Sequence, residues 1–219
     1  MPRGAWVRLE SVGRRATVER FLRQLDQQPG STVGERIDVY RVAADLIARE
    51  PVAYLEFGVH EGASMRFFSE RLRHAEARLH GFDSFEGLPE HWNAQNPQGH
   101  FDTDGRAPTL EDDRAEFHVG WFEQTLSEFV LDRRGPLLVN IDCDLYSSTM
   151  TVLTTIGPSL EAGDLVYFDE FADICHEYRA CKEYVSATGI ELAVIARSGT
   201  WNNVLFRVQS SPRPASSPR

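Results

Sequence analysis

The sequence predicts an α/β fold in which helices cover both faces of a doubly wound, mainly parallel sheet. Short apolar segments alternate along the 219 residues with segments whose apolar residues recur at helical spacing. This alternation is typical of parallel strands joined by helical crossovers. The last two apolar segments lie too close together for such a crossover. We therefore expect one domain, residues 1–208, whose sheet closes with an antiparallel hairpin.

Two helices precede the first strand, in a region (1–50) that we expect to form a helical lid. The first is expected at 17–25 and the second at about 33–49, where apolar residues at 37, 40, 43, 44 and 47 follow a helical period. Five apolar segments then predict strands, at 52–57, 78–82, 117–119, 136–141 and 164–168. Amphipathic segments between and after them predict helices, at 64–73, 122–129, 148–160 and 176–188.

The end of the domain is the most informative part of the pattern. Apolar segments at 191–196 and 203–208 are separated by six residues, whereas a parallel crossover needs about a dozen. The result is a seven-stranded sheet with a C-terminal antiparallel hairpin, as in class I (Rossmann-like) methyltransferases; dehydrogenase dinucleotide domains continue with parallel crossovers instead. Residues 209–219 carry three prolines and little apolar surface, so a disordered tail is expected.

Composition excludes several classes of protein. The net charge is −10, and because both ends of the chain are basic, the acidic excess lies in the body, which disfavours binding to nucleic acid. No apolar run could cross a membrane or act as a signal region. The cysteines, Cys143, Cys175 and Cys181, form no Cys-x-x-Cys pair. A cytoplasmic protein without a disulfide framework or zinc cluster is expected.

The first strand leads into a loop suited to a cationic ligand. The loop contains Glu56, Gly58 and Gly62, and the next helix starts near Ser64. Ligands of open parallel sheets lie beyond the carboxyl ends of the strands. Glu56 would repel phosphates but suits the amino group or sulfonium of S-adenosylmethionine. Alternatively, the glycines only make a tight turn and Ser64 only caps the helix.

The second strand ends in Asp83-Ser84. An acid at this position is where adenosine-binding sheets place the group that accepts hydrogen bonds from the ribose hydroxyls. Asp83 is therefore the candidate ribose ligand, and the neighbouring loop supports the same cofactor.

Three carboxylates follow the fourth and fifth parallel strands. Asp142 follows one strand, and the pair Asp169-Glu170 follows the next, so the three can converge and would then need a cation. Oxygen-only ligands favour Mg²⁺. A divalent ion lowers the pKa of a bound hydroxyl, and Asp142 is the candidate general base. The alternative is that these acids cap the following helices, and for Asp144 the two interpretations are equally weighted.

Five segments in the same order resemble the macrocin O-methyltransferase family. They read YLEFGVHEGAS from 54, GFDSFEGLPE from 81, FHVGWFEQTL from 117, IDCDLYSST from 141 and GDLVYFDEF from 163. These enzymes are metal-dependent class I methyltransferases that act on sugar hydroxyls of natural products. The resemblance implies that S-adenosylmethionine is bound by Glu56, Gly58, Gly62, Ser64, Asp83 and Ser84. It also implies that Mg²⁺ is bound by Asp142, Asp169 and Glu170, with Asp142 as general base. Glutamate at 170 is a departure, since aspartate or asparagine is expected there as often as glutamate.

The polar segment 91–113 is long for a connection inside a compact domain and predicts a functional lid, with Trp92 or Phe101 over the adenine or the acceptor. A disordered insertion is the alternative.

The expected partner is a glycosylated small-molecule acceptor, with neither nucleic acid nor membrane and with a homodimer left open. Two other functions stay open: methylation of a phenol or catechol, and cofactor binding without catalysis. A facial-triad oxygenase is disfavoured because the acidic cluster offers no histidine pair in register.

Overall fold

The computed structural model describes residues 3–26 and 30–213, with side chains from residue 13 onward. The helices are α1 (Arg3–Leu25), α2 (Arg36–Ile47), α3 (Ala63–Arg71), α4 (Phe122–Glu128), α5 (Tyr146–Ile156), the 3₁₀ helix η1 (Gly157–Ser159) and α6 (Glu177–Thr188). The strands are β1 (Ser31–Thr32), β2 (Ala53–Phe57), β3 (Arg78–Asp83), β4 (Ala115–Val119), β5 (Leu137–Ile141), β6 (Leu165–Phe168), β7 (Glu191–Arg197) and β8 (Val204–Ser210).

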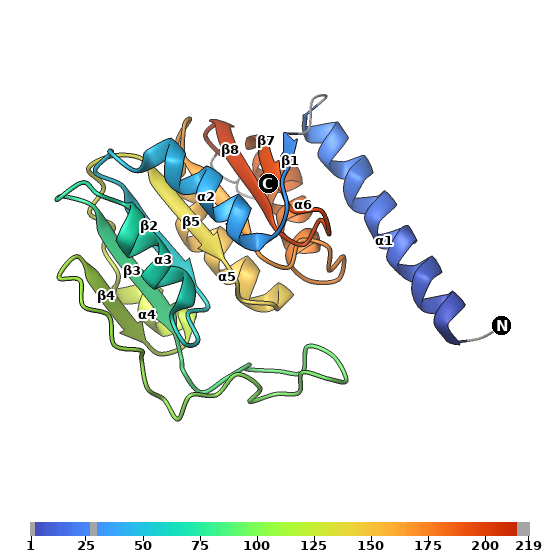
Figure 1. Ribbon diagram of the computed structural model, residues 1–219, viewed down its shortest axis with the longest axis horizontal. Coiled ribbons are helices and arrows are strands. Elements are labelled where there is room, and N and C mark those ends of the chain that lie inside the picture. The colour runs from blue at the N-terminus through green and yellow to red at the C-terminus, as the bar shows by residue number, and fades with distance from the viewer. Residues whose placement is uncertain (1–2, 27–29, 214–219) are drawn as a thin grey trace, which may run out of the picture.

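One sheet runs through the molecule in the order β1-β7-β8-β6-β5-β2-β3-β4 (Figure 1). Strands β2 to β6 are mutually parallel, and β8 lies antiparallel between β6 and β7. The predicted class I methyltransferase fold with its closing hairpin is confirmed. The sheet has one strand more than the expected seven, because the two-residue β1 pairs with β7 at the edge. A strand this short has no apolar alternation that a sequence pattern could detect.

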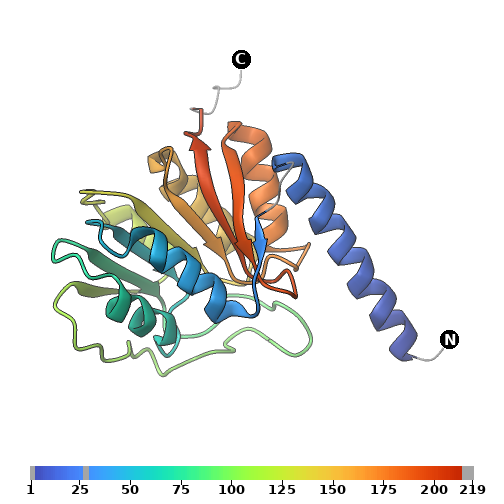
Figure 2. The ribbon, with the colours of Figure 1, turned by 45° about the horizontal axis from the view of Figure 1, so that its top comes forward.

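Helices α2 and α3 pack on one face of the sheet and α4, α5 and α6 on the other (Figures 1 and 2). An apolar core lies on each face of the sheet, and successive residues of a strand point alternately into the two cores. In β2, Tyr54 faces the α2 side, while Ala53, Leu55 and Phe57 face the opposite side. All five residues of β2 are buried, as expected for a central parallel strand. The carboxyl ends of β2, β3, β5 and β6 therefore meet at one buried edge.

Helix α1 begins at Arg3 rather than near residue 17. Its C-terminal part is anchored by Val18, Phe21 and Leu22, which belong to the same core as Phe171 and Tyr178. Toward its N-terminus the helix extends away from the sheet (Figure 2). Of the expected lid region 1–50, residues 1–2 and 27–29 lie outside the described residues. A lid role for this region stays a prediction.

The expected tail begins later than predicted. Gln209 and Ser210 extend β8, and the amide of Arg213 donates to the carbonyl of Thr188 at 3.0 Å. Prolines and serines still allow these backbone pairings, so the ordered part reaches residue 213; residues 214–219 lie outside the described residues. Among the helices described, none is both long and apolar enough to span a bilayer.

Candidate active site

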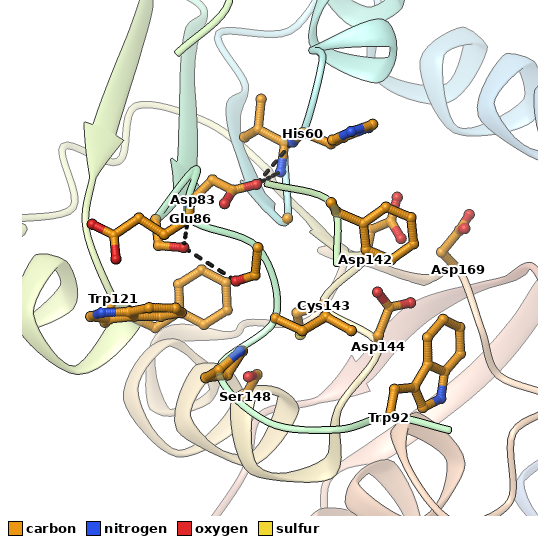
Figure 3. Close-up of a pocket in the computed structure, with 18 of the residues that line it drawn as sticks. His60, Asp83, Glu86, Trp92, Trp121, Asp142, Cys143, Asp144, Ser148 and Asp169 are labelled. Atoms are coloured by element: carbon orange, nitrogen blue, oxygen red, sulfur yellow. Dashed lines mark hydrogen bonds between the residues drawn. The ribbon is translucent and has the colours of Figure 1, made fainter. Parts of the chain in front are cut away.

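A cavity of about 1100 Å³ opens at the carboxyl edge of the sheet. Its walls come from the segments that follow β2, β3, β4, β5 and β6, which is where ligands of open α/β sheets bind. Figure 3 shows two groups of side chains in it. Asp83 and His60 lie on one side, and Asp142, Asp144 and Asp169 lie together on the other.

The loop after β2 brings these two groups close together. Gly58 has φ +92°, and a Cβ at this position would stand 1.8 Å from the carbonyl oxygen of Asp142. Only glycine permits this approach. Gly62 begins α3 with φ +74°, and a Cβ there would lie 2.7 Å from Cγ of Pro108. Gly58 thus lines the cavity, whereas Gly62 lies outside its lining and packs against the segment that follows β3.

Asp83 links the loop after β2 to the loop after β3. Its Oδ2 accepts hydrogen bonds from the amides of Val59 and His60 at 2.8 and 2.9 Å, and its Oδ1 accepts from the amide of Phe85 at 2.8 Å. Ser84 makes a turn in which its Oγ accepts from the amide of Glu86 at 3.1 Å. Asp83 and Ser84 both line the cavity. The Asp83 carboxylate has lone pairs beyond these three bonds, so it can still accept from a ligand hydroxyl.

Glu56 lies behind the cavity wall and is fully buried. Its two oxygens accept hydrogen bonds from the hydroxyls of Tyr54 and Ser64, each at 2.5 Å. Burial raises the pKa of Glu56 to about 7, against the opposing effect of these donors. Ser64 does line the cavity, while Glu56 does not. In this structure Glu56 is positioned to act on a cavity ligand through Ser64.

Asp142 and Asp169 both pair with one guanidinium group. Nη2 of Arg36 is 2.5 Å from Oδ2 of Asp142, and its Nε is 3.0 Å from Oδ1 of Asp169. Asp169 is further fixed by Asn203, whose Nδ2 donates to Oδ1 at 2.9 Å, and by the Tyr167 hydroxyl at 2.5 Å. Asp142 and Asp169 therefore meet at Arg36, as expected for acids at neighbouring strand ends. The expected convergence of three acids is not present: among the described residues, no three of these acids have ligand oxygens within 4.8 Å of one another.

Arg36 could not be found from the sequence. It stands at the first position of α2, 106 residues before Asp142, and nothing in its neighbourhood marks it as a site residue. Burial by itself disfavours the guanidinium charge, but Asp142, Tyr40 and Asp169 together raise the pKa of Arg36 above its ordinary value. The arginine supplies part of the positive charge that the acids require.

Glu170 lines the cavity, but its side chain points to a neighbour. Its Oε2 accepts from Nδ2 of Asn202 at 3.1 Å. Its amide donates to Oε2 of Glu177 at 2.9 Å. Burial and then the charge of Asp169 raise the pKa of Glu170 to about 7. Glu177 is fully buried, and its other oxygen has no hydrogen-bond partner; the sequence placed it only as the start of a helix.

Asp144 belongs to the site as well. It lines the cavity with φ +59° and is almost fully buried. Burial, followed by the charges of Glu170 and Asp169, raises its pKa to about 8. Burial, followed by Asp169, also raises the pKa of Asp142 well above its usual range. The spacing Asp-x-Asp after a strand was the signal for Asp144, although helix capping explained it equally well.

Burial is the main cause of the raised pKa values of Asp142, Asp144 and Glu170, and neighbouring carboxylates add to it. Asp142, Asp144, Asp169 and Glu170 line one cavity, and Arg36 is the cation shown in contact with this group. Carboxylate oxygens are the donors that a hard divalent ion such as Mg²⁺ prefers. The chemistry of these donors therefore suits Mg²⁺, although among the described residues the acids are not drawn together into a group of three ligand atoms within 4.8 Å of one another.

The segment 91–113 runs across the open side of the cavity. Trp92 and Phe101 both line it. Nε1 of Trp92 donates to Oδ2 of Asp173 at 3.0 Å, which links the segment to the loop after β6. The ring of Phe101 lies 5.5 Å from that of His60. These contacts hold Trp92 near the acids and Phe101 near His60; that the segment acts as a lid stays a prediction.

Residues 26–207 match the family described as Macrocin-O-methyltransferase (TylF). The chain is 30% identical over 172 residues to 8-demethyl-8-(2,3-dimethoxy-alpha-L-rhamnosyl)-tetracenomycin-C 4'-O-methyltransferase of Streptomyces olivaceus, covering 66% of this chain and 65% of that protein. It is 32% identical over 130 residues to mycinamicin III 3''-O-methyltransferase of Micromonospora griseorubida, covering 58% and 47%. The matches thus span less than two thirds of these relatives' length.

Solved structures share the fold. The calicheamicin methyltransferase CalS11 superposes with a TM-score of 0.63 at 20% identity, covering 78% of this chain and 77% of that one. The O-methyltransferase NovP gives 0.60 at 23% identity, covering 80% and 79%. At these identities the likeness concerns the fold alone.

Proposed function

The chain belongs to the macrocin O-methyltransferase family, and we propose that it transfers the methyl group of S-adenosylmethionine to a hydroxyl of a glycosylated natural product, with Mg²⁺ as the metal. The observation that carries this proposal is the single cavity in which a glycine loop with Asp83 faces the acids Asp142 and Asp169. A methyl donor and a hydroxyl acceptor have to meet in such an arrangement.

The cofactor is assigned to the side of the cavity built by the loops after β2 and β3. Gly58, Ser64, Asp83 and Ser84 line it there and would contact the cofactor directly. Gly62 shapes the start of α3, and Glu56 orients Ser64 through the bond between Oε1 and Oγ. When bound, S-adenosylmethionine supplies the methyl group, and its positive charge suits this acidic environment.

The metal is assigned to Asp142 and Asp169. Glu170 is the third ligand in this proposal, although its bond to Asn202 directs one oxygen away from the other acids. Bound Mg²⁺ lowers the pKa of a hydroxyl that coordinates it. Arg36, which contacts Asp142 and Asp169, shares this charge balance.

The general base accepts the hydroxyl proton as the acceptor oxygen attacks the methyl carbon. Asp142 is the base proposed from the sequence. Asp144 is the second candidate, because it lines the same cavity without bonding to Arg36 and because its pKa near 8 suits proton transfer at neutral pH. A carboxylate that holds a metal is a weaker base than a neighbouring free one, so the two roles can be divided between Asp142 and Asp144.

The acceptor is assigned to the open side, under Trp92 and Phe101. The cavity of about 1100 Å³ exceeds the usual range for one small ligand and leaves room for an acceptor beside the cofactor. The tetracenomycin and mycinamicin enzymes are named for methylating the 4' and 3'' positions of their glycosylated acceptors. A sugar hydroxyl is therefore the proposed target here.

The test is incubation with isotopically labelled S-adenosylmethionine, Mg²⁺ and a panel of glycosides, phenols and catechols, with products identified by mass spectrometry. Label in a glycoside, absent after EDTA treatment and absent with Asp142→Asn, supports the proposal. Label only in phenols or catechols favours that acceptor class instead. Calorimetric binding of S-adenosylhomocysteine with no turnover on any acceptor favours a non-catalytic module.

A further inference from the structure

A second, smaller cavity lies on the β3–β4 side of the sheet, next to α4. It measures about 470 Å³, and its walls include His80, Glu116, His118, Glu128 and Phe129. None of these residues lines the active-site cavity. β4 is the last strand of the sheet on this side, so the cavity sits at an edge that only β3 pairs.

The pairing of β3 with β4 gathers three metal-ligating side chains on one face. The strands are parallel, with His80 opposite Glu116 and Phe82 opposite His118. Alternate residues of a strand share a face, so His80, Glu116 and His118 point to the same side. Nδ1 of His80 lies 3.1 Å from Nε2 of His118 and 3.7 Å from Oε2 of Glu116. The three potential ligand atoms lie within 4.8 Å of one another.

These distances suit a shared transition-metal ion. Imidazole nitrogens bind Zn²⁺ at about 2.0–2.1 Å, so two of them on a tetrahedral ion stand roughly 3.3 Å apart. The measured separation of 3.1 Å is within a few tenths of an ångström of that value. The side chain of Glu116 is 65% exposed and is free to adjust toward the ion. Water can take the remaining position.

The surrounding rings hold the imidazoles in place. His118 stacks on Phe82 with centroids 4.4 Å apart, and both histidines pack edge-on against Phe129 at 5.0 and 5.2 Å. Burial lowers the pKa of both histidines, that of His80 to about 4. Both rings are therefore neutral near pH 7, and each can present an unprotonated nitrogen by placing its proton on the other ring nitrogen. The 3.1 Å contact between the two rings is itself a hydrogen bond, so its proton has to move to the other nitrogen of the donor ring when an ion enters, while the packed rings keep both nitrogens in place.

We propose that His80, Glu116 and His118 form a site for a divalent transition ion of the zinc class, separate from the acidic magnesium site. Two nitrogens and one carboxylate oxygen select such an ion over Mg²⁺, which prefers oxygen ligands. The ion cross-links the edge strand β4 to β3. The residues that follow β4, Gly120 and Trp121, line the active-site cavity, so the cross-link also stiffens that wall.

The test is a Co²⁺ titration of the EDTA-stripped full chain, with Mg²⁺ in large excess to occupy the acidic cluster. The expected result is one equivalent of Co²⁺ with the intense visible bands of a four-coordinate ion with nitrogen ligands, displaced by Zn²⁺. Oxygen-ligated octahedral Co²⁺ absorbs only weakly, so residual binding at the acids gives a different spectrum. Zn²⁺ should also raise the melting temperature.

Matched variants connect the signal to the residues. His118→Gln should weaken Co²⁺ binding by about 100-fold and Glu116→Gln by about 10-fold, the scale of losing one ligand from an open site. His74→Gln, which lies in neither cavity, is the control and should bind as the wild type. Because Glu116 is exposed, Glu116→Gln keeps the test valid if a histidine variant fails to fold. A wild type without the four-coordinate spectrum, or an unchanged spectrum in Glu116→Gln and His118→Gln, overturns the proposal.

Discussion

Arg36 occupies the position between Asp142 and Asp169 to which the metal is assigned, so removing its charge should tighten Mg²⁺ binding. The change is Arg36→Gln, which keeps a polar side chain of moderate length and removes one positive charge. In the wild type a divalent cation has to share the two carboxylates with a guanidinium that lies 2.5 and 3.0 Å from them. In the variant this competition is absent.

The size of the effect follows from these two pairs. Unit charges about 4 Å apart interact by about 4 kcal/mol at an effective dielectric constant near 20. The Arg36 side chain is 46% exposed, so solvent reduces each pair toward the ~1 kcal/mol or less typical of surface ion pairs. A total of about 1–3 kcal/mol is expected, which corresponds to roughly 5- to 150-fold tighter Mg²⁺ binding.

The measurement is calorimetric titration with Mg²⁺ at pH 9, which lies above the pKa values of about 7 and 8 of Glu170 and Asp144, so their protonation competes less with the metal. Arg41→Gln is the matched control, because Arg41 lies on the same helix and pairs with Asp38 at 2.6 Å on the exposed surface. Its Mg²⁺ affinity should equal that of the wild type. An unchanged or weaker affinity in Arg36→Gln would refute the competition and remove Arg36 from the metal site.

The remaining predictions concern the acids, Asp83, Gly58 and the pH dependence of stability. Asp142→Asn should lower the methyl-transfer rate by roughly 10² or more while S-adenosylhomocysteine binding is retained, and Glu170→Gln should lower the rate less. Asp144→Asn should lower the rate while Mg²⁺ still binds in calorimetry. Equal rates in wild type and Asp144→Asn would leave Asp142 as the base. Asp83→Ala should weaken S-adenosylhomocysteine binding by about 1.5–3 kcal/mol and lower the melting temperature, since it also loses three amide bonds; unchanged affinity would remove Asp83 from the site. Gly58→Ala should destabilise the fold by more than about 1 kcal/mol in urea unfolding, because its Cβ would overlap the Asp142 carbonyl. In EDTA the melting temperature should fall as pH rises from 5 to 8. The reason is that Glu170 and Asp144, with pKa values near 7 and 8, bind more protons in the folded state than in the unfolded state over this range. Mg²⁺ at pH 8 should restore the melting temperature, and a melting temperature independent of pH would contradict the raised pKa values of these two acids.

Local patterns in the sequence were sufficient for every strand of the sheet except the two-residue β1, and for the residues at its carboxyl edge. Asp83, Asp142 and Asp169 each follow a strongly apolar strand, so their positions at one edge follow from parallel pairing. The predicted hairpin was confirmed for the same reason, since the short connection allowed no other topology.

Features that depend on how distant elements pack could not be predicted. Arg36 reaches the acids because α2 crosses the face of β2 and β6, which no spacing in the sequence records. Helix α1 starts 14 residues earlier than expected, because residues 3–16 show no apolar stripe that a periodicity search could detect. Glu177 is buried against the amide of Glu170 by the turn between β6 and α6, although its neighbours mark it only as a helix start.

The position of β8 has a consequence for synthesis of the chain. β8 is the last strand described, yet it lies between β6 and β7 and pairs with both. Each of these two strands therefore lacks its β8 neighbour until residues 204–210 have left the ribosome. Asn203, which fixes Asp169 through Nδ2, emerges at the same moment. A nascent chain can assemble β2 to β6 early, because domains form progressively during translation. The acidic half of the cavity, however, acquires its final geometry only when the closing strand inserts, so incomplete chains should expose the edge of β6 to chaperones and proteases.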